Sequence, residues 1–135
     1  MKIKIGKYNR KGGQKVSIKL DSWDTFSADN TLALIIHPVL VAYRAVPEEN
    51  RGILCGSFDE DVPVHLKSTI GVIDGGGDAE EELRAAQWDW ILCEMIWAFD
   101  MKINTDLWDM RGTIKEQRML NGMKLFGKYF NGLCR

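Results

Sequence analysis

The sequence has little of what metal centres and disulfide frameworks need. It contains only two histidines, His37 and His65, and its three cysteines, Cys55, Cys93 and Cys134, are widely spaced. An odd number of cysteines without a CxxC pair predicts neither a disulfide framework nor a zinc site, so we expect reduced thiols. We therefore predict no metal site and no cofactor.

Other absences limit the function classes. No apolar run approaches the roughly 20 residues that span a bilayer, and the first residues lack the apolar segment and cleavage site of a signal peptide. GxSxG, HExxH and zinc-deaminase motifs are missing. The glycines at 75–77 are followed by acids rather than by a Walker lysine, which disfavours a phosphate-binding loop. We predict one intracellular domain over residues 1–135, with no membrane partner and no catalytic residues.

Charge is distributed unevenly along the chain. Residues 1–20 carry no acid, whereas the remainder carries 11 basic and 19 acidic side chains, a net charge of −8. The acidic body disfavours duplex nucleic acid, and a small phosphorylated ligand fits this layout better. The basic residues either form a solvated face with charged edge protection or contact phosphate, and both interpretations stay open. The seven basic side chains are Lys2, Lys4, Lys7, Arg10, Lys11, Lys15 and Lys19.

The N-terminal part, residues 1–20, predicts a β-hairpin. Apolar and basic side chains alternate over residues 2–8 and 15–20, and turn-forming residues occupy 9–14 between them. A lone two-stranded hairpin is marginal in water. We therefore expect its apolar face to pack on the helices that follow.

Residues 27–46 predict a kinked helix, with Ser27 or Asp29 as its N-cap. Pro38 removes one backbone donor inside this run, so we expect either a kink or two short helices that meet near His37. We interpret His37 as a hydrogen-bonded core residue rather than a catalytic one.

Residues 47–77 predict an irregular segment with one helical turn within 59–66. Three consecutive acids at 59–61 are a candidate for binding a hard cation, but their spacing is not that of a calcium loop. A solvated or N-terminal charge run is the better interpretation. The glycines at 75–77 predict a flexible joint before the next helix.

Residues 78–135 predict a helical hairpin. Its first helix, about 79–101, contains no Gly or Pro over 88–100 and begins with acids that complement the helix dipole. The second runs from about 113 to 131, and Gly122 and Gly127 indicate close backbone approach to another element. The fold class is thus α+β: an N-terminal antiparallel β-hairpin packed on about three main helices, with the central one as the core. The broad apolar face of that helix comprises Trp88, Ile91, Leu92, Met95, Ile96 and Phe99.

A second apolar patch lies nearly opposite that face. It comprises Trp90, Trp97 and Met101, with Glu94 beside it. A helix that is apolar on two sides needs a partner on each side. We therefore predict a homo-oligomer with these four residues at its interface.

A small phosphorylated ligand would need a few cations and an aromatic platform. No spacing rule selects the groups, so candidates are chosen by residue type. Basic residues would contact phosphate, and aromatic residues would stack on a ring. The predicted ligand-binding residues are Lys4, Arg10, Lys11, Trp23, Trp108, Arg118 and Tyr129.

Seven blocks of the sequence carry a resemblance to known proteins: Met1–Gly6, Asp21–Asp29, Thr31–Ala33, Ile35–Pro38, Asp59–Pro63, Trp88–Phe99 and Asn121–Phe130. In the same order, these blocks resemble a family of small accessory proteins of tailed bacteriophages. Three features depart from the family: Trp23 and Phe26 stand where it usually has Tyr and Trp, Cys93 stands where it usually has an acid, and an insertion common after the first strand is missing. The resemblance implies a phage protein in the host bacterial cytoplasm and supplies no catalytic residues.

Three functions are compatible with these features. The first is a non-enzymatic counter-defence protein that sequesters a nucleotide-derived immune signal, as indicated by the phage resemblance, the cationic hairpin and the aromatic surface. The second is a protein-binding inhibitor of a host enzyme or defence complex that acts through the acidic surface. The third is a phage structural or assembly protein.

Overall fold

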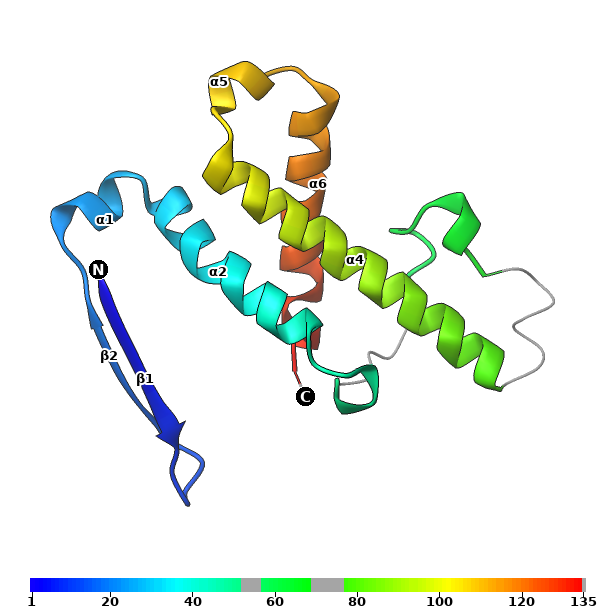
Figure 1. The fold of residues 1–135 in the computed structure, drawn as a ribbon, viewed down its shortest axis with the longest axis horizontal. Helices are drawn as coiled ribbons and strands as arrows, with labels where there is room; N and C mark the ends of the chain where they lie inside the picture. The colour runs from blue at the N-terminus through cyan, green and yellow to red at the C-terminus, as the bar shows by residue number, and fades with distance from the viewer. Residues whose placement is uncertain (52–56, 69–76, 135) are drawn as a thin grey trace. The chain divides into compact units, whose positions relative to one another are not determined.

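The computed structural model describes residues 1–51, 57–68 and 77–134. Two compact units make up the chain, residues 1–32 and residues 33–135. An N-terminal hairpin and short helix are followed by three main helices (Figure 1). The α+β class and the order of its elements are therefore confirmed. None of the described helices is long and apolar enough to cross a membrane.

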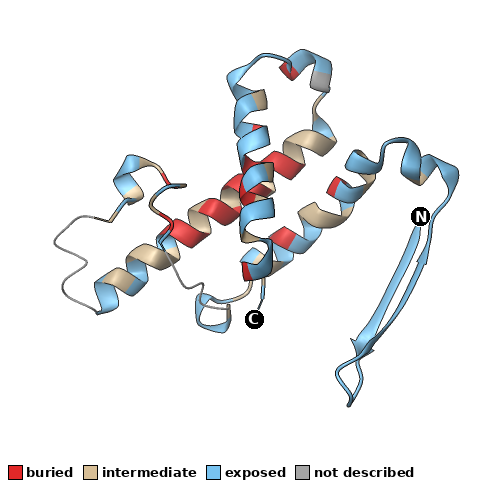
Figure 2. Ribbon diagram, turned by 180° about the vertical axis from the view of Figure 1, so that it is seen from behind, coloured by how far each residue is buried: buried red, intermediate tan, exposed pale blue. Residues whose placement is uncertain are grey.

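The hairpin of the first unit has the predicted strands. β1 (Lys2–Tyr8) pairs antiparallel with β2 (Gln14–Lys19), and the register shifts by one residue between Ile5 and Tyr8. The Asn9 side chain accepts hydrogen bonds from the amides of Lys11 (2.8 Å) and Gly13 (3.0 Å), which closes the turn. Within this unit every strand residue is exposed (Figure 2). The expected packing of the hairpin on the helices stays a prediction.

A short helix after the hairpin was not predicted. α1 (Ser22–Phe26) begins with a capping box in which Asp21 accepts from the Asp24 amide and Asp24 accepts from the Asp21 amide. The Met1 ammonium lies 3.0 Å from the Asp24 carboxylate. The hydrogen bond from the Asp21 amide and the contact with the Met1 ammonium lower the pKa of Asp24, and the amide has the larger effect.

The first long helix, α2 (Ala28–Arg44), is continuous through Pro38. The alternative of two short helices is therefore wrong. Ala33 and Leu40, which stand on either side of Pro38, are both buried, and this shared apolar face favours one helix over two. A kink at Pro38 stays a prediction.

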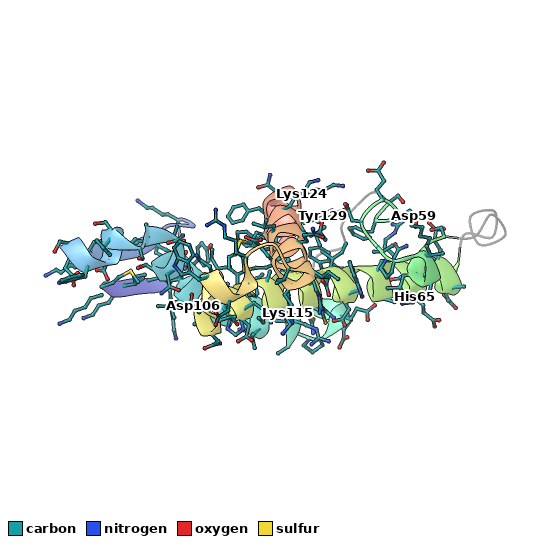
Figure 3. The ribbon with its side chains drawn as sticks, turned by 90° about the horizontal axis from the view of Figure 1, so that it is seen from above. Asp59, His65, Asp106, Lys115, Lys124 and Tyr129 are labelled. Atoms are coloured by element: carbon teal, nitrogen blue, oxygen red, sulfur yellow. The ribbon has the colours of Figure 1, made fainter. Side chains whose placement is uncertain are left out.

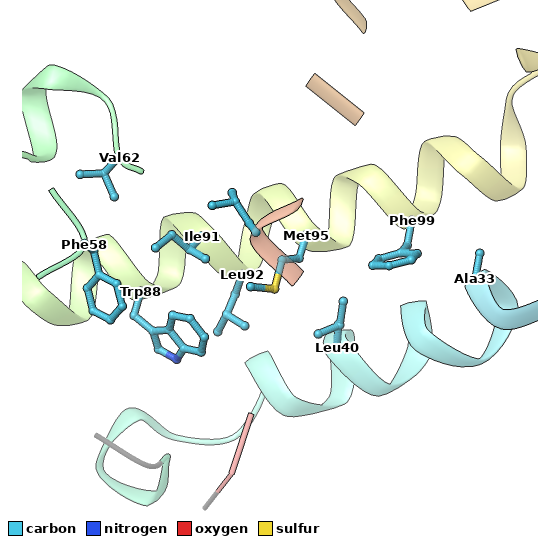
Figure 4. Close-up of a cluster of buried hydrophobic side chains, with 10 residues drawn as sticks. Ala33, Leu40, Phe58, Val62, Trp88, Ile91, Leu92, Met95 and Phe99 are labelled. Carbon is cyan, nitrogen blue, oxygen red and sulfur yellow. The ribbon is translucent and has the colours of Figure 1, made fainter. Parts of the chain in front are cut away.

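The central helix, α4 (Asp78–Asn104), is the core element, as predicted. Figure 2 shows that its buried residues occupy the middle of the helix, and Figure 4 shows the side chains that meet there. α2 runs antiparallel beside it, because Arg44 contacts Asp89 and His37 lies 4.0 Å from Asp100. The buried cluster contains Ala33, Leu40, Phe58, Val62, Trp88, Ile91, Leu92, Met95, Phe99 and Leu125.

The last long helix, α6 (Ile114–Tyr129), follows the short α5 (Leu107–Met110), crosses α4 and ends in η3 (Phe130–Gly132) (Figure 1). A Cβ built on Gly122 would lie 2.5 Å from the Ala98 Cβ and 2.5 Å from the Glu94 carbonyl oxygen. The predicted close approach is thus confirmed at Gly122. The prediction is wrong at Gly127, which is exposed and where a built Cβ would have no other described element within 4 Å.

The second apolar face of α4 has partners within the protomer. Glu94 is buried and accepts hydrogen bonds from the Arg118 guanidinium at 2.6 and 2.9 Å. The same guanidinium lies 4.1 Å from the centre of the Trp97 ring. Met101 packs with Trp97 against a small buried cluster, and Trp90 packs against the main one. The role of this face in an oligomer stays a prediction.

The segment between α2 and α4 is irregular where it is described, as predicted. It contains two short 3-10 helices, η1 (Glu48–Asn50) and η2 (Val64–Leu66), and η2 is the expected turn within 59–66. Cys55 and the glycines at 75–76 lie outside the described residues. Of the described cysteines, Cys93 and Cys134 are free thiols.

Candidate ligand-binding cavity

A cavity of about 750 Å³ lies beside the first turns of α4. Its wall consists of residues of η1, of Arg51 directly after η1, of Phe58, and of α4 residues from Glu80 to Trp88. All of these residues belong to the second unit. Small-molecule sites in proteins commonly have volumes of about 300–1,000 Å³, so the cavity has the size of a ligand site.

Polar contacts hold the segment 57–68 against α4 and thereby place Phe58 at the cavity. The Asp59 carboxylate accepts hydrogen bonds from the Ser68 amide (2.9 Å) and from Gln87 Nε2 (2.8 Å). Gln87 is buried and also donates to the Leu66 carbonyl (2.7 Å). These hydrogen bonds lower the pKa of Asp59, and the bond from the Ser68 amide has the largest effect.

A second set of contacts ties the same segment to α6. The Asp61 carboxylate accepts hydrogen bonds from the Tyr129 hydroxyl and from the Lys128 ammonium. Burial together with the Asp61 carboxylate raises the pKa of Tyr129 to about 12. Figure 3 shows Tyr129 on α6 and Asp59 on the segment that these bonds anchor. The segment that carries Phe58 is therefore fixed by contacts with two helices, α4 and α6.

Two aromatic rings, those of Phe58 and Trp88, form the floor of the cavity. Phe58 stacks on Trp88 with ring centres 5.8 Å apart (Figure 4). Tyr129 meets both rings edge-on but does not line the cavity. Only 2% of Phe58 and 7% of Trp88 is exposed, so a ligand contacts a small part of these rings. The rings give the cavity a rigid apolar base rather than a broad stacking surface.

Arg51 is the distinctive polar group of the cavity. Its side chain is 11% exposed, yet its Nε and Nη1 atoms have no hydrogen-bond partner within the described parts of the chain. The nearest carboxylate, that of Asp89, is 3.8 Å from Nη1 and already accepts two hydrogen bonds from Arg44 at 2.9 Å. Because unmatched buried donors are costly, an anionic group that reached these atoms would stabilise Arg51.

Carboxylates surround the rest of the cavity. Four glutamates and two arginines line it: Glu48, Glu49, Glu80, Glu81, Arg51 and Arg84. The Arg84 guanidinium is already paired with the Glu80 carboxylate at 3.0 Å. A ligand with several phosphates would meet net repulsion here. A ligand with one negative group and several hydroxyl or amino donors would match both Arg51 and the glutamates.

The ligand-binding residues predicted from the sequence lie elsewhere. Lys4 is on β1, Arg10 and Lys11 are in the turn, and Trp23 is on α1, all in the first unit. In the second unit, Trp108 is exposed on α5, Arg118 is paired with Glu94, and Tyr129 is bonded to Asp61. None of the seven lines the cavity. Their part in binding stays a prediction.

Sequence reasoning missed Arg51. It is a single arginine in an irregular segment, so neither helical nor strand periodicity marks it, and its burial arises only from packing beside α4. A metal would need different groups: among the described residues, no cluster of three or more His, Cys, Asp or Glu side chains is placed to hold one.

No protein-family model, no curated protein and no solved structure matches this chain. The resemblance to phage accessory proteins therefore stays a prediction based on the sequence blocks. Functional inference depends on the geometry of the cavity and on the charge of its walls.

Proposed function

We propose that the protein is a non-enzymatic binding protein that holds one small ligand in the cavity beside α4. The observation that carries the proposal is Arg51, which lines the cavity and whose Nε and Nη1 atoms have no hydrogen-bond partner among the described residues. Sites built to bind anions keep such donors ready for the ligand at a cost to the stability of the free protein.

The ligand class follows from charge and size. One anionic group suits Arg51, and the four glutamates suit hydroxyl and amino groups while disfavouring further phosphates. A cyclic mononucleotide or another nucleotide derivative with one negative charge meets these conditions. In a phage protein, such binding would sequester a nucleotide-derived immune signal of the host and thereby oppose its defence.

Isothermal titration calorimetry with a ligand panel tests this proposal. The panel contains cyclic mononucleotides, cyclic ADP-ribose isomers, nucleoside monophosphates and nucleoside triphosphates. We expect the singly charged members to bind and the triphosphates to bind more weakly, because each added phosphate faces the glutamates. Failure of every member to bind, or tightest binding of a triphosphate, contradicts the proposal.

A second function, inhibition of a host protein, is favoured by the outer surface of α2. This helix buries Ala33 and Leu40 but exposes Leu34 and Val41 on one flank and Leu32 and Val39 on another. A helix that is apolar on all sides normally has partners on all sides. A stoichiometric host protein recovered from bacterial lysate, and lost when Leu34 and Val41 are replaced by Gln, would favour this function over the first.

A further inference from the structure

The register of the hairpin gathers lysines on one face. Lys2 stands directly opposite Lys19, and Lys4 stands opposite Ser17. Lys15 lies opposite Gly6, since a Cβ built on Gly6 would be 3.7 Å from the Lys15 Cβ. Because side chains alternate along a strand, these four lysines project from the same side of the sheet. We call Lys2, Lys4, Lys15 and Lys19 the lysine face.

The opposite face of the hairpin is apolar. Ile3 pairs with Ile18, and Ile5 pairs with Val16. All four of these side chains are exposed within the first unit. The two faces therefore have separate characters, and a partner of the lysine face does not contact the apolar one.

The positive charge of the lysine face is not neutralised within its unit. Lysines directly opposite each other repel, which weakens a hairpin. Among the described residues, none of the four lysines is in an ion pair, and the nearby Asp24 is engaged by the Met1 ammonium and the Asp21 amide. Both strands of this two-stranded sheet are edges, so edge protection accounts for lysines on each strand but not for the placement of Lys2 directly opposite Lys19. The arrangement fits a surface that meets a row of negative charges.

The kind of polyanion follows from the shape of this surface. A membrane would take up the apolar face and leave the lysines pointing away from the lipid headgroups. The major groove of a duplex admits a two-stranded β-ribbon, but a duplex has a higher phosphate charge density than a single strand, and the net charge of −8 on residues 21–135 disfavours it. A flexible single strand can follow the face, where Lys2 and Lys4 are about 7 Å apart on β1 and Lys15 and Lys19 are about 14 Å apart on β2.

We propose that the lysine face binds the phosphodiester backbone of a single-stranded nucleic acid without sequence preference. This binding uses no residue of the cavity and is independent of the function proposed above. With four phosphate contacts, the slope of log K against log salt is about −2.8 for a single strand. Affinity should therefore fall by about 50-fold between 50 and 200 mM salt.

Fluorescence anisotropy of a labelled oligothymidine strand, measured over this salt range, tests the proposal with the full-length protein. The test variant is Lys2→Gln with Lys19→Gln, which halves the lysine face and relieves the repulsion between opposed lysines. The matched control is Lys115→Gln with Lys124→Gln, which removes the same charge from exposed lysines of α6 (Figure 3). Circular dichroism verifies that both variants are folded.

We expect the slope to fall to about −1.4 in the test variant, since two contacts remain, and to stay near −2.8 in the control. Three results would overturn the proposal: no binding at 50 mM salt, equal slopes in the two variants, or binding to duplex DNA, polyglutamate or anionic vesicles that matches or exceeds binding to the single strand.

Discussion

Replacing Gly122 with alanine should loosen the packing between α4 and α6. The added methyl group would lie 2.5 Å from the Ala98 Cβ and 2.5 Å from the Glu94 carbonyl oxygen, and neither atom belongs to the far end of a flexible side chain. The matched control is Gly127→Ala on the same helix, where the added methyl group would have no other element of the described chain within 4 Å. Both changes improve intrinsic helix propensity by about 1 kcal/mol.

The magnitudes follow from these two environments. Overpacking typically costs about 1–3 kcal/mol, and contact with a backbone carbonyl places Gly122→Ala at the upper end. After the gain in propensity, we expect the free energy of unfolding to fall by about 2 kcal/mol in Gly122→Ala and to rise by about 1 kcal/mol in Gly127→Ala. The two variants should therefore differ by about 3 kcal/mol.

Urea denaturation followed by tryptophan fluorescence measures this difference. The slope of unfolding free energy against urea should be the same in both variants, because the surface exposed on unfolding changes little. Equal stability of the two variants would refute the crossing of α6 over α4 at Gly122. A stability loss in Gly127→Ala would refute the assignment of that glycine to an open position.

Two further substitutions test the contacts around the core. Tyr129→Phe removes the hydroxyl that donates to Asp61 and should cost about 1.5–3 kcal/mol at neutral pH, as for hydrogen bonds to charged groups. The pKa of Tyr129 is raised to about 12, so its contribution to the free energy of unfolding is complete below pH 10 and is lost as the pH rises through 12. The stability advantage of the wild type over Tyr129→Phe should therefore shrink between pH 10 and 12. Trp97→Ala removes the ring beneath Arg118 and should lower the free energy of unfolding by about 3 kcal/mol. Unchanged stability together with dissociation in light scattering would instead place Trp97 at a subunit contact.

Periodic patterns account for the elements that the sequence predicted well. The alternation in residues 2–8 and 15–20 indicates β1 and β2, and the long stretch without glycine or proline indicates α4. α1 was missed although its capping box, Asp21 with Asp24, is visible in the sequence. The apolar run of α2 is the stronger pattern, so only one helix was predicted in this part of the chain.

Features that depend on three-dimensional packing were not predictable. A glycine in a helix indicates close approach only where another element crosses it, and the sequence does not distinguish Gly122 from Gly127. Arg118 was selected as a ligand-binding residue by its type, whereas the structure pairs it with the buried Glu94. Arg51 carries no pattern at all, since its burial and its unmatched nitrogen atoms arise from the packing of segments distant in sequence.

The most direct test of the central claim compares two arginine variants by calorimetry. Arg51 lines the cavity, whereas Arg111, the exposed residue that follows α5, does not. For a cyclic mononucleotide that binds the wild type, we expect Arg51→Met to weaken binding by roughly 10- to 100-fold, the loss of a charge-assisted hydrogen bond, and Arg111→Met to change the affinity little. Unchanged affinity in Arg51→Met, or an equal loss in Arg111→Met, would contradict the assignment of Arg51 as the anion-binding group.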